Sequence, residues 1–296
     1  MPQNACRGKG IRYNRAMRDT LADILHIRSC PALQNATLVL AFSGWMDGGN
    51  VSTGTVDRLV NLLEAQPIAE IDPEPFYIYN FPGPMEVAAM FRPYIEIEDG
   101  VIKTIRMPTN MFYCHEPAGL LLFVGKEPNM RWRSFGECIF ELAAKTGVRR
   151  ILFVGSFGGS VPHTRQPRLF ISASEAELVA EMGSYGVRRS GYEGPGAFTS
   201  YLMTRAAAAG VQMVSLVAEI PGYLQGTNPL CIEAVTRRLA KILQLPLRLD
   251  SLRTASTDWE LQISAVIERD KDLAEKVRNL EIEYDNDLVQ RGAEEA

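Results

Sequence analysis

The stretch TLVLAFSGWMDGGN, residues 37–50, decides the fold class of this 296-residue chain. Its first six residues, Thr37–Phe42, form an unbroken apolar run, which is typical of a strand buried on both faces of a sheet. After the glycine-rich turn, apolar residues recur at the spacing of one helix face. These are Val56, Leu59, Val60 and Leu63. A strand, a turn and a helix in this order predict a parallel α/β unit.

The same pattern recurs along the chain. Gly119–Val124, Ile151–Val154 and Val211–Val217 are short apolar runs that indicate further buried strands, and amphipathic helical patterns alternate with them. Ser172 and Glu175 have the spacing of a capping box, which predicts a helix start. We therefore predict a three-layer α/β/α fold with a mixed, mostly parallel sheet.

Two segments depart from this pattern. Tyr94–Ile97 and Val101–Ile105 flank an Asp-Gly turn signal, which predicts a β-hairpin insertion. Near the C-terminus, two series of residues repeat every seven positions, and together they predict a long amphipathic helix or a helical hairpin, packed on the body or on another subunit. The first series is Trp259, Val266, Leu273 and Leu280, and the second is Ile263, Asp270, Val277 and Tyr284.

Charge divides the chain into three regions. Residues 1–34 are predicted to be a basic arm and lead-in, because residues 1–30 carry six Lys and Arg against two Asp. Residues 35–250 are predicted to form the α/β domain. Residues 251–296 are predicted to be an acidic helical extension, with twelve Asp and Glu against six Lys and Arg.

Composition excludes several classes of function. The formal net charge of −4 disfavours a nucleic-acid partner, and no apolar stretch approaches the roughly 18 residues that span a membrane. Five widely spaced cysteines without a C-x-x-C pair favour reduced thiols and a cytoplasmic protein. With three histidines in all, we expect no metal site, and we expect no cofactor.

Glycine-rich segments follow or lie between the predicted core elements, at the edge of the sheet where ligands bind in α/β proteins. They are Ser43–Asn50, Gly155–Arg165, Gly191–Gly196 and Glu219–Thr227. They either converge on a pocket or serve as tight turns. In the first segment the candidate ligand-binding residues are Ser43, Gly44, Asp47 and Gly48. Asp47 is alternatively a helix cap.

Two further groups carry candidate chemistry. His163 and Arg165 could form a proton-transfer and anion-binding pair, or lie in a surface loop whose histidine is held by a neighbouring carbonyl. We expect His163→Ala to leave the fold intact. Glu127, Arg131 and Trp132 could frame a pocket under a tryptophan lid, or hold their connection rigid.

Five motifs, in order across residues 35–245, resemble the proteasome assembly chaperone 2 family in its bacterial and archaeal branch. They are FSGWMDGGN, GKEPNMRW, VPHTR, YEGPGAF and IPGYL followed by NP. The resemblance implies a fold similar to purine nucleoside phosphorylases, with relatives that help assemble proteasome rings. His163 and Arg165 match the family motif. Gly222 stands where many bacterial relatives have histidine, and Tyr223, the residue after it, is a further candidate ligand-binding residue.

Two functions remain open. The first is an assembly-chaperone-like or binding protein that acts through protein–protein surfaces, with a proteasome-like or other protein partner, as a homo-oligomer with a trimer as first guess. The alternative is an enzyme, a hydrolase, transferase or ligase-like protein on a nucleoside-phosphorylase-like scaffold, acting on a small anionic substrate. Glu193 or Glu219 would then be the acid or base, with His163 and Arg165 on the anion. The enzyme requires these side chains to converge on one site.

Overall fold

The computed structural model describes residues 21–294, so the first 20 residues of the predicted basic arm lie outside the described chain. Within the described residues, nine strands form one sheet in the order β1-β3-β6-β7-β2-β8-β11-β9-β10. Their bounds are β1 Leu25–Ile27, β2 Ala36–Ser43, β3 Gln66–Ile71, β6 Met111–His115, β7 Leu120–Lys126, β8 Val148–Gly159, β9 Arg168–Ala173, β10 Arg188–Arg189 and β11 Gln212–Pro221. Two more strands, β4 Tyr94–Glu98 and β5 Val101–Arg106, pair only with each other.

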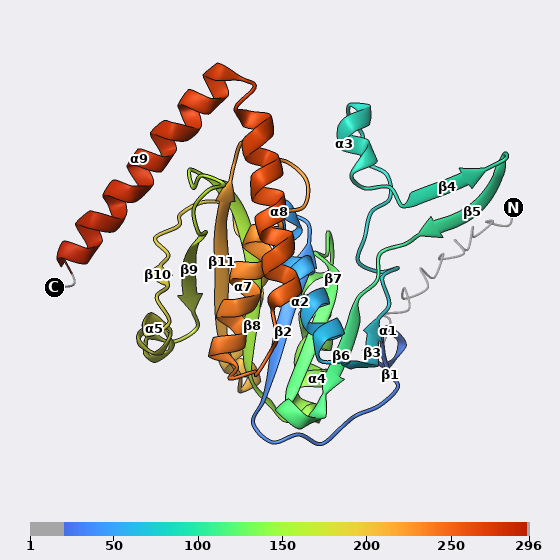
Figure 1. The fold of residues 1–296 in the computed structure, drawn as a ribbon. Coiled ribbons are helices and arrows are strands. Elements are labelled where there is room, and N and C mark those ends of the chain that lie inside the picture. Colours follow the sequence, from blue (N-terminus) through green and yellow to red (C-terminus); the bar gives the residue numbers. More distant parts are fainter. Residues whose placement is uncertain (1–20, 295–296) are drawn as a thin grey trace, which may run out of the picture.

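Helices cover both faces of the sheet (Figure 1). Their bounds are α1 Leu21–Ile24, α2 Val51–Leu62, α3 Met85–Ala89, α4 Trp132–Thr146, α5 Ala176–Gly183, α6 Phe198–Ala206, α7 Pro229–Ile242, α8 Asp250–Ile267 and α9 Lys271–Glu294. Helices α4 and α6 pack on one face, whereas α2, α5 and α7 pack on the other. None of the helices in the described residues has both the length and the apolar composition needed to cross a membrane.

Strand β2 shows why the sequence produces two cores. Leu38, Leu40 and Phe42 point to the face covered by α4 and α6, and the intervening Val39 and Ala41 point to the face covered by α2 and α7. Because successive side chains of a strand alternate between faces, an unbroken apolar run serves both layers. The predicted three-layer α/β/α fold with a mixed sheet is confirmed.

The parallel strands lie at the centre of the sheet. β7, β2, β8 and β11 are neighbours and pair in parallel, whereas β6 and β9 pair antiparallel to the two outer members of this group. The predicted capping box is wrong. Ser172 lies inside β9 and pairs with Ser215 of β11, and α5 begins after Glu175 without a side-chain cap.

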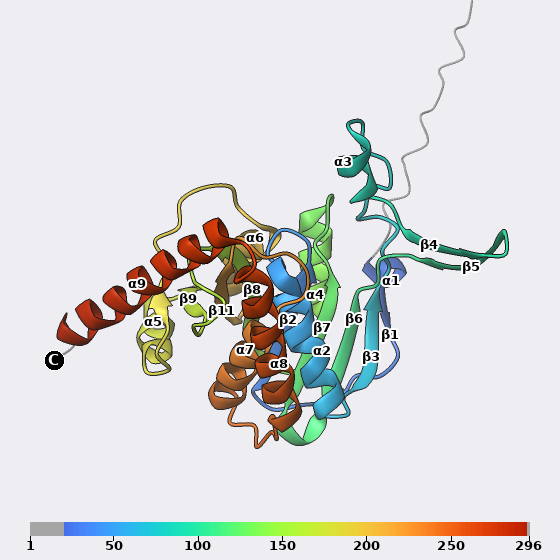
Figure 2. The same cartoon turned by 45° about the horizontal axis from the view of Figure 1, so that its top comes forward.

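Two appendages leave this body. Residues 81–107, which we call the arm, contain α3 and the predicted β4–β5 hairpin and project away from the sheet (Figures 1 and 2). The turn of the hairpin places Asp99 and Gly100 at φ values of 51° and 75°, as its Asp-Gly sequence favours. At the other end, α8 packs on α7, and α9 turns back from it across the end of the sheet that carries β9 and β10 (Figure 2).

Candidate functional site

Glu127 joins two loops at the carboxyl edge of the sheet. Its backbone N–H donates to the carbonyl of Ser43 at 2.9 Å. Its carboxylate accepts from the backbone N–H of Trp45 at 3.2 Å and from that of Phe198, at the start of α6, at 2.8 Å. Gly44 has a φ of 132°, and a Cβ there would lie 3.2 Å from Glu127 Cβ. In this geometry the carboxylate is used to hold the turn after β2 against α6.

Trp132 and Arg131 lie where α4 begins. Trp132 donates its indole N–H to the carbonyl of Pro128 at 2.8 Å, and its ring packs edge-on against Phe198 with centroids 5.8 Å apart. Arg131 has a left-handed backbone conformation, with a φ of 55°, at the position just before the helix. The indole therefore braces this connection from inside and does not cover a pocket as a lid.

Asp47 caps the first turn of α2. Its carboxylate accepts from the backbone N–H of Thr53 at 3.1 Å and from the Thr53 hydroxyl at 2.8 Å. Such a cap satisfies one of the amides that the start of a helix leaves unpaired. Burial raises the pKa of the Asp47 carboxyl to about 6. The adjacent Gly48 carbonyl accepts from the hydroxyl of Ser156, so the whole turn is fastened to β8.

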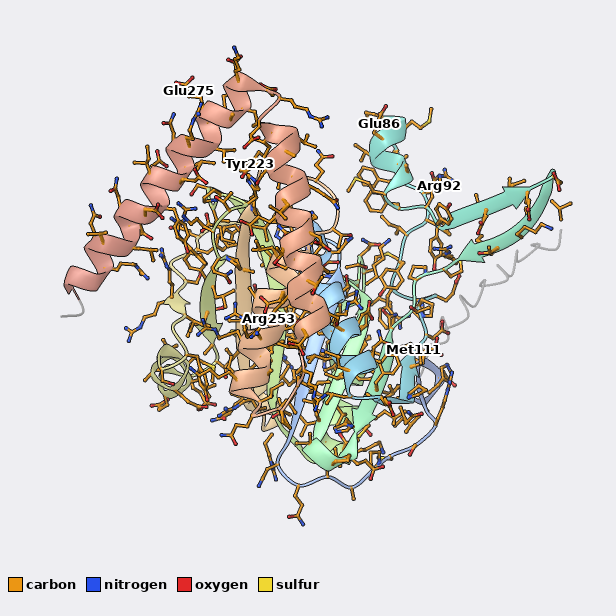
Figure 3. The ribbon with its side chains drawn as sticks, in the orientation of Figure 1. Glu86, Arg92, Met111, Tyr223, Arg253 and Glu275 are labelled. Carbon is orange, nitrogen blue, oxygen red and sulfur yellow. The ribbon has the colours of Figure 1, made fainter. Side chains whose placement is uncertain are left out.

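His163 is buried, with 2% of its surface exposed, so the predicted surface-loop position is wrong. Its Nδ1 lies 2.8 Å from the hydroxyl of Tyr223, and its Nε2 lies 3.1 Å from the hydroxyl of Ser264 in α8. Two hydroxyls, and not a carbonyl, hold the ring. Burial lowers the pKa of His163, which favours the neutral imidazole. Figure 3 shows Tyr223 near the two C-terminal helices that this histidine helps to hold.

Arg165 binds an anion, but the anion belongs to the same chain. Its guanidinium makes a two-point contact with Asp285 of α9, at 2.9 and 2.8 Å, and lies 3.6 Å from Glu281. The neighbouring Thr164 hydroxyl donates to Glu281. The predicted anion-binding residue therefore holds the C-terminal helix in place.

Glu219 faces a different partner. It is buried at the end of β11 and accepts from the backbone N–H of Ser160 at 2.8 Å and from Arg168 at 3.2 Å. Arg168 Nε lies 3.4 Å from Asp287 of α9. Gly159 has to be glycine beside it, because a Cβ there would lie 2.3 Å from a carboxylate oxygen of Glu219.

The side chains that the enzyme hypothesis requires do not meet around a shared opening. His163 contacts Tyr223 and Ser264, Arg165 contacts α9, and Glu219 contacts Arg168. Glu193 lies exposed in the loop between β10 and α6. Three of the four groups thus hold the C-terminal helices or the sheet.

Gly222 occupies a close approach between two strand ends. Its N–H donates to the carbonyl of Gly159 at 3.0 Å, and a Cβ at Gly222 would lie 3.0 Å from the same oxygen. A histidine at this position would require the end of β8 to shift. In this chain, glycine permits the tight backbone contact.

Sequence reasoning missed an apolar surface on the arm. In the β4–β5 register Ile95 pairs with Ile105 and Ile97 with Ile102, and a bulge at Lys103 keeps all four isoleucines on one face. Their exposed fractions run from 44% to 61%. The alternation of isoleucine and glutamate in YIEIE was the available signal, since it describes a strand with one apolar face.

Solved structures place the chain among known folds. A proteasome-assembly chaperone homologue from Mycobacterium tuberculosis is 30% identical, with a TM-score of 0.69, and the match covers 81% of this chain and 99% of that one. A PAC2 family protein from Streptomyces avermitilis is 27% identical, with a TM-score of 0.68 and coverage of 82% and 99%. An archaeal proteasome activator from Pyrococcus furiosus, at 17% identity, a TM-score of 0.61 and coverage of 82% and 97%, shows the fold alone.

A comparison of the sequence with models of protein families identifies the family. No curated protein matches the sequence. The family model for PAC2 matches residues 41–267, a span that contains the motifs from the β2 turn to the start of α7. With the M. tuberculosis homologue at 30% identity, this confirms the predicted resemblance: the chain belongs to the PAC2 family.

Proposed function

We propose that this chain is an assembly-chaperone-like protein that binds a protein partner through the isoleucine face of its arm. The observation that carries the proposal is the set of four isoleucines, Ile95, Ile97, Ile102 and Ile105, which share one face of the β4–β5 hairpin and stay exposed. Apolar groups gathered on one exposed face are typical of protein interaction sites.

The arm also lacks the support that a hairpin needs on its own. A two-stranded hairpin is marginally stable in water unless another strand, a helix or a core covers one face. Here β4 and β5 pair only with each other and project from the body (Figure 2). Complete burial of an exposed isoleucine contributes about 1.5–3 kcal/mol, and covering these four, which are already about half buried, would contribute about half of that for each side chain. A partner that binds this face would therefore stabilise the arm as well as the complex.

The part of the arm around α3 carries further exposed apolar side chains. Met85 in α3 and Met90 just after it have 81% and 74% of their surface exposed. Methionine is flexible and polarizable, which suits a surface that adapts to a partner. The rings of Phe81 and Phe91 stack with centroids 4.8 Å apart, so α3 is closed at its base by its own aromatic pair.

The relatives suggest the kind of partner. Solved structures similar to this chain include a proteasome-assembly chaperone homologue and a proteasome activator. By analogy we propose a partner that is a subunit of a larger protein assembly, proteasome-like or other, with the chain itself acting as a homo-oligomer and a trimer as first guess. We also propose a cytoplasmic location, which is supported by the free thiols of Cys30, Cys114, Cys138 and Cys231.

Native mass spectrometry of the chain purified gently from its own host tests the proposal. The test variant replaces Ile95, Ile97, Ile102 and Ile105 with threonine, which keeps the β propensity of the strands. A matched control replaces four exposed apolar residues of the C-terminal helices, Leu261, Val266, Ile282 and Val289, with glutamine. The control removes as many apolar side chains from a different surface.

We expect the wild-type chain and the control to carry the same partner subunit, and the threonine variant to lose it. The free energy of unfolding should be alike in all three chains, because the changed residues are exposed. Retention of the partner by the threonine variant, or its loss from the control alone, would show that the arm is not the binding surface.

A further inference from the structure

A cleft opens where the arm meets the carboxyl edge of the sheet. Strands β2 and β7 are parallel neighbours whose last residues, Ser43 and Lys126, lie side by side in the register. In α/β proteins, ligands bind outside the carboxyl ends of such strands. The cleft has a volume of about 360 Å³, which is in the range of small-molecule sites.

The two walls of the cleft come from different parts of the chain. The body contributes Ser43, Lys126 and two residues of α2, Thr53 and Asp57. The arm contributes residues 91–94, between α3 and the start of β4, and residues 106–107, at the end of β5, and Pro108 and Thr109 follow it. Figure 3 shows Arg92 at this junction, between α3 and β4. The cleft therefore depends on the position of the arm.

Lys126 places an unpaired positive charge in the cleft. Its backbone is fixed, because its N–H donates to Asn110 and its carbonyl accepts from the hydroxyl of Tyr77. Its ammonium lies 5.7 Å from the centre of the Tyr77 ring, and among the described side chains it forms no ion pair. Partial burial lowers the pKa of Lys126, which reflects the cost of a charge without a counter-ion.

Two arginines of the arm face the same space. Arg92 donates to the amide oxygen of Asn80 at 3.1 Å, and Arg106 has a carboxylate, that of Glu96, at 3.9 Å. A guanidinium has five N–H donors, so most of the donors on both arginines are open to a ligand. An exposed ion pair as long as that of Arg106 also contributes little and is easily exchanged.

One negatively charged side chain and several uncharged hydroxyl groups complete the lining. Asp57 is the single carboxylate that lines the cleft, against the three cations Arg92, Arg106 and Lys126, and burial raises its pKa. Hydroxyls are available on Ser43, Tyr94 and Thr109. This lining favours a ligand with a negative group and a hydroxyl or amino group.

We propose that this cleft is a binding site for a small organic anion, a carboxylate or a phosphate ester, held by Lys126 from the sheet and by Arg92 and Arg106 from the arm. Such a ligand joins the arm to the body, because its cationic partners come from both. Occupancy of the site thus fixes the angle at which the arm projects. The isoleucine face lies on the opposite side of the hairpin from Tyr94 and Arg106, so it stays free when the cleft is filled.

The test is calorimetric titration of the full chain with inorganic phosphate, glycerol 3-phosphate and succinate. We expect saturable binding of at least one probe, weakened about ten- to hundredfold in Lys126→Met and in the double variant Arg92→Gln/Arg106→Gln. A preference for the phosphates or for succinate identifies which anion the site takes. The double variant keeps the test valid if Lys126→Met does not fold.

Hydrogen exchange separates this site from general attraction to a charged surface. A saturating probe should slow exchange at residues 91–94 and 106–109, and Lys145→Met, an exposed control on α4, should bind as wild type does. Absence of saturable binding by every probe, or equal binding by Lys126→Met, would overturn the proposal. The four-isoleucine variant should bind the anion normally, so failure of the partner proposal and failure of this one are distinguishable.

Discussion

The arm and the C-terminal helices extend from the same sheet, but they are held in opposite ways. Helix α9 is fixed by charged groups, with Asp285 paired to Arg165 and Asp287 paired to Arg168 and Arg188. Its buried apolar contacts are Val277 and Tyr284. The arm instead keeps its ion pairs within its own hairpin and exposes its isoleucines.

The C-terminal helices are therefore docked on the body of the protein, whereas the arm exposes its apolar face to solvent. The acidic extension has its basic partners in the loop after β8 and at the start of β9, so its charge is used within the chain. The apolar face of the arm has no cover among the described residues. Acid and salt should therefore act on the C-terminal helices, whereas apolar-to-polar changes in the arm should act on binding and spare the fold.

The largest expected effect is at Arg168. In Arg168→Ala the buried carboxylate of Glu219 loses its cation, and α9 loses both an ion pair and the guanidinium that lies 4.6 Å above the Tyr284 ring. Removing one partner of a buried pair leaves an uncompensated charge, so we expect urea denaturation to show a loss of about 3–5 kcal/mol in the free energy of unfolding.

Arg28→Ala is the matched control, because Arg28 pairs with Glu70 on the exposed edge of the sheet. An exposed pair contributes little, and the control should lose less than about 1 kcal/mol. Equal losses in the two variants would mean that the charged network does not hold α9, and the contrast between the two appendages would disappear.

The parts of the fold that the sequence predicts are those with strong local patterns. The strands β2, β7, β8 and β11 contain apolar runs and end in glycine, proline or polar residues, and the hairpin follows from its Asp-Gly turn. β9 was missed, because its sequence RLFISA alternates weakly and is followed directly by a helical pattern. Its assignment depends on pairing with β11, a contact that local sequence does not contain.

The candidate site was harder to predict for a related reason. The sequence shows that His163 and Arg165 have the chemistry to bind polar and anionic groups, and they do so. It does not show that their partners are Ser264 and Asp285, which lie 101 and 120 residues further along the chain. The local sequence alone does not distinguish a residue that binds its own chain from one that binds a ligand.

The next effect in size is at His163, whose burial leads us to expect a loss of stability in His163→Ala, in contrast to the prediction made from the sequence. The variant removes a buried ring, leaves the hydroxyl of Ser264 without its partner, and leaves the hydroxyl of Tyr223 with only the backbone N–H of residue 163. Unsatisfied buried groups cost about 1–3 kcal/mol, and the melting temperature should fall by several degrees. His163→Gln, which can both donate and accept, should restore part of the loss. If the melting temperature of His163→Ala is unchanged, the contact of His163 with Ser264 does not help to hold α8.

A smaller effect is expected from acid. The hydrogen bond from Arg165 lowers the pKa of Asp285, and that from Arg188 lowers the pKa of Asp287. Both carboxylates therefore stabilise the docked helix above their ordinary pKa, near 4, and this contribution is lost as the pH falls through the lowered values. Hydrogen exchange corrected for its intrinsic pH dependence should show α9 opening before the central strands. Simultaneous opening of α9 and β2 would contradict this order.

The smallest expected effect on stability is in the arm. A small effect is informative, because it would show that the isoleucine face does not stabilise the fold. Replacing Ile97 and Ile102 with threonine removes apolar surface that is about three-fifths exposed, so the free energy of unfolding should change by no more than about 0.5 kcal/mol. If the pair instead costs about 2 kcal/mol in the isolated chain, the face is covered in solution, most simply by a second copy. Repeating the measurement at two protein concentrations separates these cases, because stability that depends on self-association rises with concentration. A null effect at both concentrations means that the apolar face does not serve the fold of this chain, which leaves recognition of another protein as its use.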